Sequence, residues 1–245
     1  MSHRLIVPST WKIPPEITTR LGSEAGRQRL MDHEGHLLLI LHRLPEADSN
    51  EREPVLFWRQ PDGKWETNEK GQGLPALKKH VESYEAAAEA LDLRLDTTRD
   101  ADGLFRILSA AAPLARSAKN LHQVLQALRE VTGNETEIIT LRDEAYSIER
   151  TVDLLRVEAK NALDFDIARR AEEQAAQSRE ISTAAHRLNL MAAIFLPITA
   201  IASILGVNMH TGFEEFPTYV YWLLMGFSLF LGFVLLLIIQ RKSAS

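Results

Sequence analysis

The sequence predicts an α+β amino-terminal domain, a very long stalk helix after it, and a two-helix transmembrane hairpin at the carboxyl end. Three observations predict this order. Residues 1–133 mix short strand-like runs with helical patterns, and residues 134–196 contain neither Gly nor Pro. Residues 188–239 contain no Lys, Arg or Asp. We therefore expect a charged, water-exposed part and an apolar, membrane-embedded part in one chain.

Composition excludes several classes of function. The chain has 245 residues and a formal net charge of -5, whereas nucleic-acid binders normally carry a basic face. It has no cysteine, which rules out disulfides and thiolate metal sites. The start, Met1 to Arg4, lacks the apolar core of a signal peptide. No Ser/His/Asp spacing supports catalysis, so we expect neither an enzyme nor a resident cofactor.

Residues 1–133 are expected to form a cytoplasmic α/β domain with a helical end. A turn at residues 61–63 (Pro-Asp-Gly) predicts a hairpin between the segments around Trp58 and Trp65. Short strands are expected at Leu5–Val7, His36–Leu41 and Val55–Arg59. Helices are expected from Pro15, from Pro75 to Leu91, over Asp102–Ala111 and over Pro113–Val131. Asp32-His33-Glu34-Gly35-His36 lacks the spacing of a helical metal site, and its glycine indicates a turn.

Residues 134–187 are expected to form the stalk. Asn134 and Glu137 fit a capping box at its start. Apolar residues then recur in steps of four and three at Leu141, Ala145, Ile148, Val152, Leu155, Ala159 and Ala162. This seam could pack within one subunit or against stalks of neighbouring subunits, and we expect the second arrangement for at least part of it.

Two uncharged stretches predict the membrane spans. Residues 219–240 include a run of 21 uncharged residues, Tyr219 to Ile239, long enough to cross a hydrocarbon core. Residues 188–205 are a weaker candidate for a membrane span, because they include polar residues and many alanines. They suit an inner helix that its partner helix shields from lipid. Residues 206–218 form the connecting loop, and residues 241–245 form a short tail.

Charge predicts the orientation of this hairpin. Arg179, His186 and Arg187 precede the first span, and Arg241 and Lys242 follow the second, whereas residues 206–218 contain no Lys or Arg. By the positive-inside rule both termini are cytoplasmic and the loop faces the outside. The expected location is the inner (plasma) membrane, crossed twice.

One segment carries a family resemblance. Residues 194–208 read Ile-Phe-Leu-Pro-Ile-Thr-Ala-Ile-Ala-Ser-Ile-Leu-Gly-Val-Asn. They resemble the first transmembrane helix of the CorA family of divalent cation transporters, whose pattern is I-F-x-P-L-T-x-I-A-x-I-x-G-M-N. The short acidic loop and the second apolar span after the segment match the family as well. Val207 replaces the central Met, and the M-P-E segment usual after G-M-N is absent.

The resemblance implies a homopentamer in the lipid bilayer, with the first span lining the pore. Gly206, Val207 and Asn208 would form its outer mouth, with Gly206 ending the helix and five Asn208 amides ringing the axis. Thr199 would line the pore two and a half turns deeper, and Pro197 would kink the helix. A ring of amide oxygens can hold hydrated Mg2+ without stripping its waters.

The loop adds further candidate residues. Glu214 and Glu215 would attract external cations by focusing the electric field, although a merely solvated turn explains them equally well. His210 is a weak candidate metal contact at the mouth, because imidazole suits Zn2+ or Ni2+ better than Mg2+.

The expected function is passage of divalent cations into the cytoplasm. Mg2+ is the first expectation, and Co2+, Ni2+ or Zn2+ are alternatives. A proton-coupled zinc transporter of the ZntB type is a second reading, and a non-conducting membrane scaffold or sensor with the same fold is a third. No nucleic-acid partner is expected.

Overall fold

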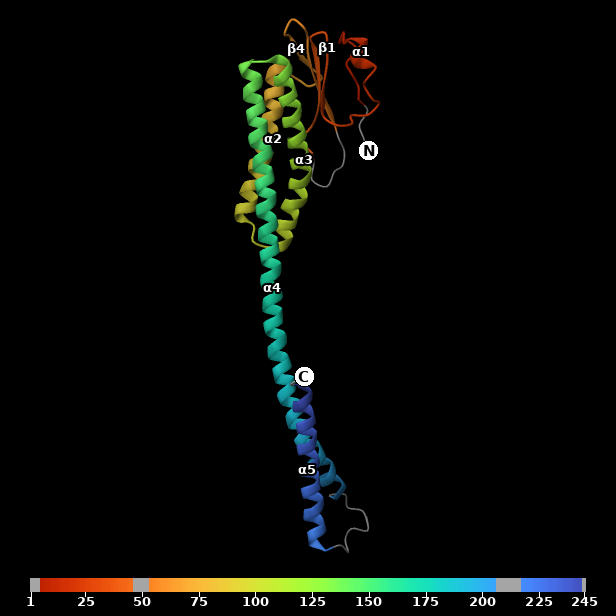
Figure 1. Cartoon of the computed structure of the whole chain (residues 1–245), viewed down its shortest axis with the longest axis vertical. Helices are drawn as coiled ribbons and strands as arrows, with labels where there is room; N and C mark the ends of the chain where they lie inside the picture. The colour runs from red at the N-terminus through yellow and green to blue at the C-terminus, as the bar shows by residue number, and fades with distance from the viewer. Residues whose placement is uncertain (1–4, 46–52, 206–216, 244–245) are drawn as a thin grey trace. The chain divides into compact units, whose positions relative to one another are not determined.

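A computed structural model of the chain describes residues 5–45, 53–205 and 217–243. The chain divides into two compact units, Met1–Ala168 and Arg169–Ser245. The first holds a small sheet and the helices packed on it, and the second holds the end of one long helix and the last helix (Figure 1).

The sheet of the first unit has four antiparallel strands in the order β1-β2-β3-β4. They are β1 (Arg29–His33), β2 (His36–His42), β3 (Pro54–Arg59) and β4 (Trp65–Thr67). The β3–β4 hairpin pairs Arg59 with Trp65, as the Pro-Asp-Gly turn predicts. The β1–β2 turn places Glu34 at φ 45° and Gly35 at φ 80°, so the His-rich segment is a tight hairpin.

Both faces of the sheet are covered, which explains why β2 is an almost unbroken apolar run. Leu37, Leu39 and Leu41 face the main core, to which α2 (Gly73–Thr97) and α3 (Ala101–Thr132) contribute. Leu38 and Ile40 face a second, smaller core. That core is closed by the amino-terminal segment and α1 (Pro15–Thr18), with Ile17 fully buried and Trp11 against Trp58.

Three expectations for this unit were wrong in detail. Leu5–Val7 has no strand structure, although Leu5 and Val7 pack against the second core. The edge strand β1 was not expected, because its sequence Arg-Leu-Met-Asp-His is short and polar. The two helices expected around Pro113 form the single helix α3.

Packing explains how α3 continues through Pro113. Proline removes one helical hydrogen bond, but Ile107 and Ala111 before it and Leu114 and Ala115 after it are all buried. At the start of α3 the Oδ1 atom of Asp100 accepts a hydrogen bond from the Gly103 backbone N–H at 2.8 Å. Burial on both sides of the proline therefore outweighs the lost bond.

The long helix α4 runs from Thr136 to Leu205 and contains 70 residues. It begins two residues after the expected cap, and Leu205 is the last residue described before residue 217. The apolar seam from Leu141 to Ala159 is buried in the core shared with α2 and α3. This part of the seam therefore packs within one subunit. Residues 171–180 are all exposed in the single chain.

Candidate functional site

Only two of the predicted site residues lie in the part of the chain that the structure describes. Pro197 and Thr199 lie within α4, in the second unit. The other candidates, namely Gly206, Val207, Asn208, His210, Glu214 and Glu215, lie outside the described residues. The described residues around the expected site are therefore those of the last turns of α4 and of the next helix, α5 (Thr218–Ser243).

Thr199 projects from α4 as an exposed side chain. Its Oγ1 hydroxyl donates a hydrogen bond to the Phe195 backbone carbonyl, with an oxygen–oxygen distance of 2.8 Å. The hydroxyl proton is thereby held against the helix, and the oxygen lone pairs are left for a donor or a cation. A threonine in this state can accept a hydrogen bond from a hydrated ion.

Pro197 lies inside α4, eight residues before the end of the helix. Proline has no backbone N–H, so the carbonyl four residues earlier, that of Ala193, loses its helical partner. Ala193 is buried at 9% exposure, and Gly232 of α5 lies against its carbonyl oxygen. Sequence reasoning did not single out Gly232, because its partner lies 39 positions away in the chain.

The surfaces of these two helices are otherwise apolar and exposed. On α4, Leu188, Met191, Phe195 and Leu196 are exposed. By length and composition that helix could cross a membrane. On α5 the exposed large residues include Tyr219, Trp222, Leu223, Phe227, Phe230 and Phe233. Water would disfavour this much exposed apolar area on one chain.

Charged residues gather into no metal site in the described ranges. No group of three or more His, Asp or Glu side chains there is arranged to hold an ion. His33 instead lies 3.6 Å from a Glu16 oxygen, and the ring of His36 stacks on Trp58 at 5.7 Å.

A buried polar network joins the sheet to α2 and α3, and the sequence offered no sign of it. The Tyr84 hydroxyl lies 2.8 Å from the His42 carbonyl, to which it donates, and 2.7 Å from Ser117 Oγ. Gln28 Nε2 donates to the same Ser117 Oγ at 3.0 Å. Burial raises the pKa of Tyr84 to about 12, so the hydroxyl keeps its proton.

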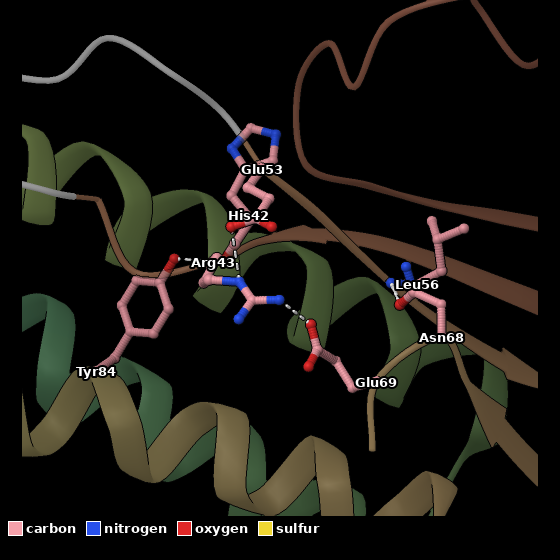
Figure 2. A network of polar contacts seen from close by, with 7 residues as sticks. All are labelled: His42, Arg43, Glu53, Leu56, Asn68, Glu69 and Tyr84. Carbon is pink, nitrogen blue, oxygen red and sulfur yellow. Dashed lines mark hydrogen bonds and ion pairs between the residues drawn. The ribbon is translucent and has the colours of Figure 1, made fainter. Parts of the chain in front are cut away.

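Arg43 continues this network toward the surface. Its guanidinium pairs with Glu53 through Nε at 2.9 Å and also with Glu69 (Figure 2). Figure 2 also shows Asn68 beside Leu56, where the Asn68 Oδ1 accepts from the Leu56 N–H at 2.8 Å. Together these bonds fix the residues that directly follow β2 and β4. Their role is structural.

His80 lies beside this network on α2. Burial, and after it the positive charge of Arg43, lowers its pKa from 6.5 to about 4. The ring contacts Phe57 and Tyr84 at centroid distances of 5.8 and 5.5 Å. His80 is therefore neutral at physiological pH.

A second link joins α3 to α4. His122 Nδ1 lies 2.7 Å from Glu149 Oε2, and the His122 ring lies 5.3 Å from that of Tyr146. Arg59 on β3 pairs with Glu135, just before α4, at 2.5 Å. The His122–Glu149 contact holds the first part of α4 against α3, and the Arg59–Glu135 contact holds its start against β3.

Comparison with known proteins adds family information. A family model described as CorA-like Mg2+ transporter protein matches residues 74–241. This range includes α2, α3, α4 and nearly all of α5. A search among curated proteins found no match.

Two solved structures share the fold of this chain at TM-scores above 0.5, and a third is similar at a lower score. The ZntB cytoplasmic domain from Vibrio parahaemolyticus aligns with a TM-score of 0.54 at 12% identity, over 66% of this chain and 80% of that one. The full-length CmaX protein aligns with a TM-score of 0.56 at 13% identity, over 95% and 83%. The CorA magnesium transporter from Methanocaldococcus jannaschii aligns with a TM-score of 0.47 at 14% identity, over 88% and 78%.

Proposed function

Because the chain belongs to the CorA-like Mg2+ transporter protein family, we propose that it passes divalent cations across the inner membrane as a homopentamer. The family match carries this proposal, since it extends through the stalk and both apolar helices rather than over one motif. The exposed apolar surfaces of α4 and α5 support it, because lipid and neighbouring copies would cover them.

The proposed conduction path follows the last turns of α4. One hairpin cannot enclose water, so several copies must surround an axis. Thr199 would line the pore with an oxygen whose proton is already donated to Phe195. Gly206, Val207 and Asn208 would follow at the outer mouth, where amide oxygens accept hydrogen bonds from the waters of Mg2+.

The membrane potential supplies the driving force in this proposal. Moving two positive charges inward across 100 mV releases about 4.6 kcal/mol, so uptake needs no ATP. Glu214 and Glu215 would raise the local cation concentration at the entrance. Ten carboxylates in five copies would focus the field there, and high salt would weaken the effect.

The ion proposed first is Mg2+, in line with the description of the family. The Met-to-Val change at Val207 and the presence of His210 keep Zn2+, Co2+ and Ni2+ as alternative substrates. Proton-coupled zinc transport of the ZntB type would differ from this proposal by its dependence on an imposed pH gradient.

The test is reconstitution of the full chain in liposomes with ion-selective dyes and an imposed inside-negative potential. We expect Mg2+ uptake by the wild type and a loss of at least about tenfold in Asn208→Ala, because each missing amide leaves the hydrated ion one hydrogen-bond acceptor short. Asn189→Ala, in α4 before Pro197, is the matched control and should retain uptake.

The protein must first be shown to be folded and to assemble from five copies of the 27.6 kDa chain. Native mass measurement gives that number. Uptake of Zn2+ but not Mg2+ would change the assigned substrate. No flux of any divalent cation through a folded pentamer would contradict conduction and favour a membrane scaffold or sensor.

A further inference from the structure

The backbone of α4 has a weak point inside the second unit. Proline at position 197 has no N–H to donate, so the carbonyl of Ala193 has no partner within the helix. The proline ring also crowds this turn, and helices bend at such positions. The residues beyond it, from Ile198 to Leu205, include Thr199 and lead directly to residues 206–208.

Gly232 of α5 lies against this turn. A Cβ atom placed on Gly232 would stand 3.2 Å from the Ala193 carbonyl oxygen, 3.3 Å from Ile194 Cα and 3.4 Å from the Ile194 oxygen. All three atoms belong to the backbone, so no side-chain rotation can make room. A hydrogen atom stands where the Cβ would be, so the two backbones can approach closely beside the released Ala193 carbonyl.

The neighbouring turn of α5 has the same character. Ser228 lies four residues before Gly232 and is fully buried. Its Oγ donates to the Met225 carbonyl of its own helix at 2.8 Å, so it brings no unsatisfied group to the contact. Small residues four positions apart allow two helices to approach closely in a membrane. By contrast, a Cβ on Gly226 would meet nothing within 4 Å.

We propose that Gly232 is a positioning residue for the ion path, acting through the turn that Pro197 has released. Glycine lets α5 close on the Ala193 and Ile194 carbonyls, and this contact sets the direction of the last turns of α4. The inference rests on the proposed function for its consequence on transport. The contact itself stands on geometry alone.

The first test compares two glycines of one helix. Because the chain has no cysteine, Thr199→Cys introduces a single thiol that reports on the last turns of α4. In that background we expect Gly232→Ala to change the rate of modification by a small water-soluble maleimide by about twofold or more, since a displacement of a few tenths of an ångström is forced on backbone atoms. Gly226→Ala should leave the rate unchanged.

The second test removes the weak point. Pro197→Ala restores an N–H for the Ala193 carbonyl, which then turns back along the helix axis. In the Pro197→Ala background we expect the effect of Gly232→Ala on the thiol to shrink. An equal effect with and without the proline would overturn the pairing, and equal rates for Gly232→Ala and Gly226→Ala would overturn the role of Gly232.

Substitution of Gly232 should also affect the stability of the protein and its transport rate. Gly232→Ala should lower the midpoint of thermal unfolding by about 3–10 °C, the effect of overpacking, and Gly226→Ala should not. In liposomes that conduct Mg2+, Gly232→Ala should lower the maximal uptake rate more than it changes the half-saturating concentration. A conducting protein whose uptake Gly232→Ala leaves unchanged would contradict the positioning role. The thiol readout needs no flux, so it stands apart from any failure of the proposed function.

Discussion

Single residues in the first unit show how burial controls charge. Tyr84 is fully buried, and its hydroxyl forms hydrogen bonds with the His42 carbonyl and with Ser117 Oγ. His80, one helical turn earlier, has no partner for its buried Nε2 within the described part of the chain. A proton added to this imidazole would be a buried charge near the Arg43 guanidinium. The fold therefore favours neutral His80.

This preference predicts a pH dependence of stability. The pKa of His80 is about 4 in the folded chain and 6.5 as the ordinary value, so between these values the unfolded chain binds more protons. Stability is then fully present above about pH 6.5 and falls as the pH drops toward 4, by on the order of 3 kcal/mol at most. His80→Leu should flatten this part of the curve.

The measurement is thermal unfolding of the full chain in detergent between pH 7.5 and pH 4. Carboxylates also titrate in this range, so the comparison is the difference between His80→Leu and wild type. The control is His33→Leu, at the carboxyl end of β1. An unchanged slope in His80→Leu would contradict the assignment to His80.

At the scale of one element, α4 changes its environment along its length. Its seam from Leu141 to Ala159 is buried among α2 and α3, whereas residues 171–180 are exposed in the single chain. Periodicity predicted the seam, and the structure assigns this part of it to packing within one subunit. The apolar residues at the end of the same helix are exposed, and in the proposed function lipid or a neighbouring copy covers them.

Leu155 tests the intramolecular packing. Its side chain is 2% exposed, so Leu155→Ala should destabilise the first unit by about 2–5 kcal/mol through lost burial and a residual cavity. The matched control is Leu93→Ala on α2, where the leucine is 68% exposed and the cost should stay within about 0.5 kcal/mol.

Urea unfolding followed by tryptophan fluorescence gives both values, because Trp58 is buried in this unit. Equal midpoints for Leu155→Ala and Leu93→Ala would mean that the seam of α4 does not pack as described.

At the scale of the whole molecule, the charge pattern predicts how the chain lies in the membrane. Positive residues flank both apolar segments on one side, and residues 206–218 have none. Single-cysteine variants are straightforward here because the chain has no cysteine of its own. In intact cells a membrane-impermeant maleimide should label Thr211→Cys in the loop.

The same reagent should label Ser2→Cys and Ser245→Cys only after the cells are permeabilised, since both termini are expected in the cytoplasm. Labelling of the terminal variants in intact cells, or protection of Thr211→Cys, would contradict the proposed orientation. The acidic loop would then face the cytoplasm and would not attract external cations.

Much of the fold could be predicted from the sequence because the signals are local. The absence of Gly and Pro from residues 134–196 predicts a continuous helix, and the Pro-Asp-Gly turn predicts the β3–β4 hairpin. For the candidate site, the family motif placed Pro197 and Thr199 in the last turns of α4, where the structure has them. Asn208 and its neighbours remain a prediction from that motif.

Periodicity, hydropathy and a spaced motif are local signals, and they predicted the α+β domain, the long helix after it, the apolar carboxyl-terminal segments and the family. Contacts between distant positions appear only in the folded chain: Tyr84 meets Ser117, 33 positions away, and Gly232 meets the carbonyl that Pro197 releases. The tertiary structure also decided that α3 continues through Pro113 and that β1 pairs with β2. These outcomes depend on burial and contact between distant segments, for which no local pattern exists.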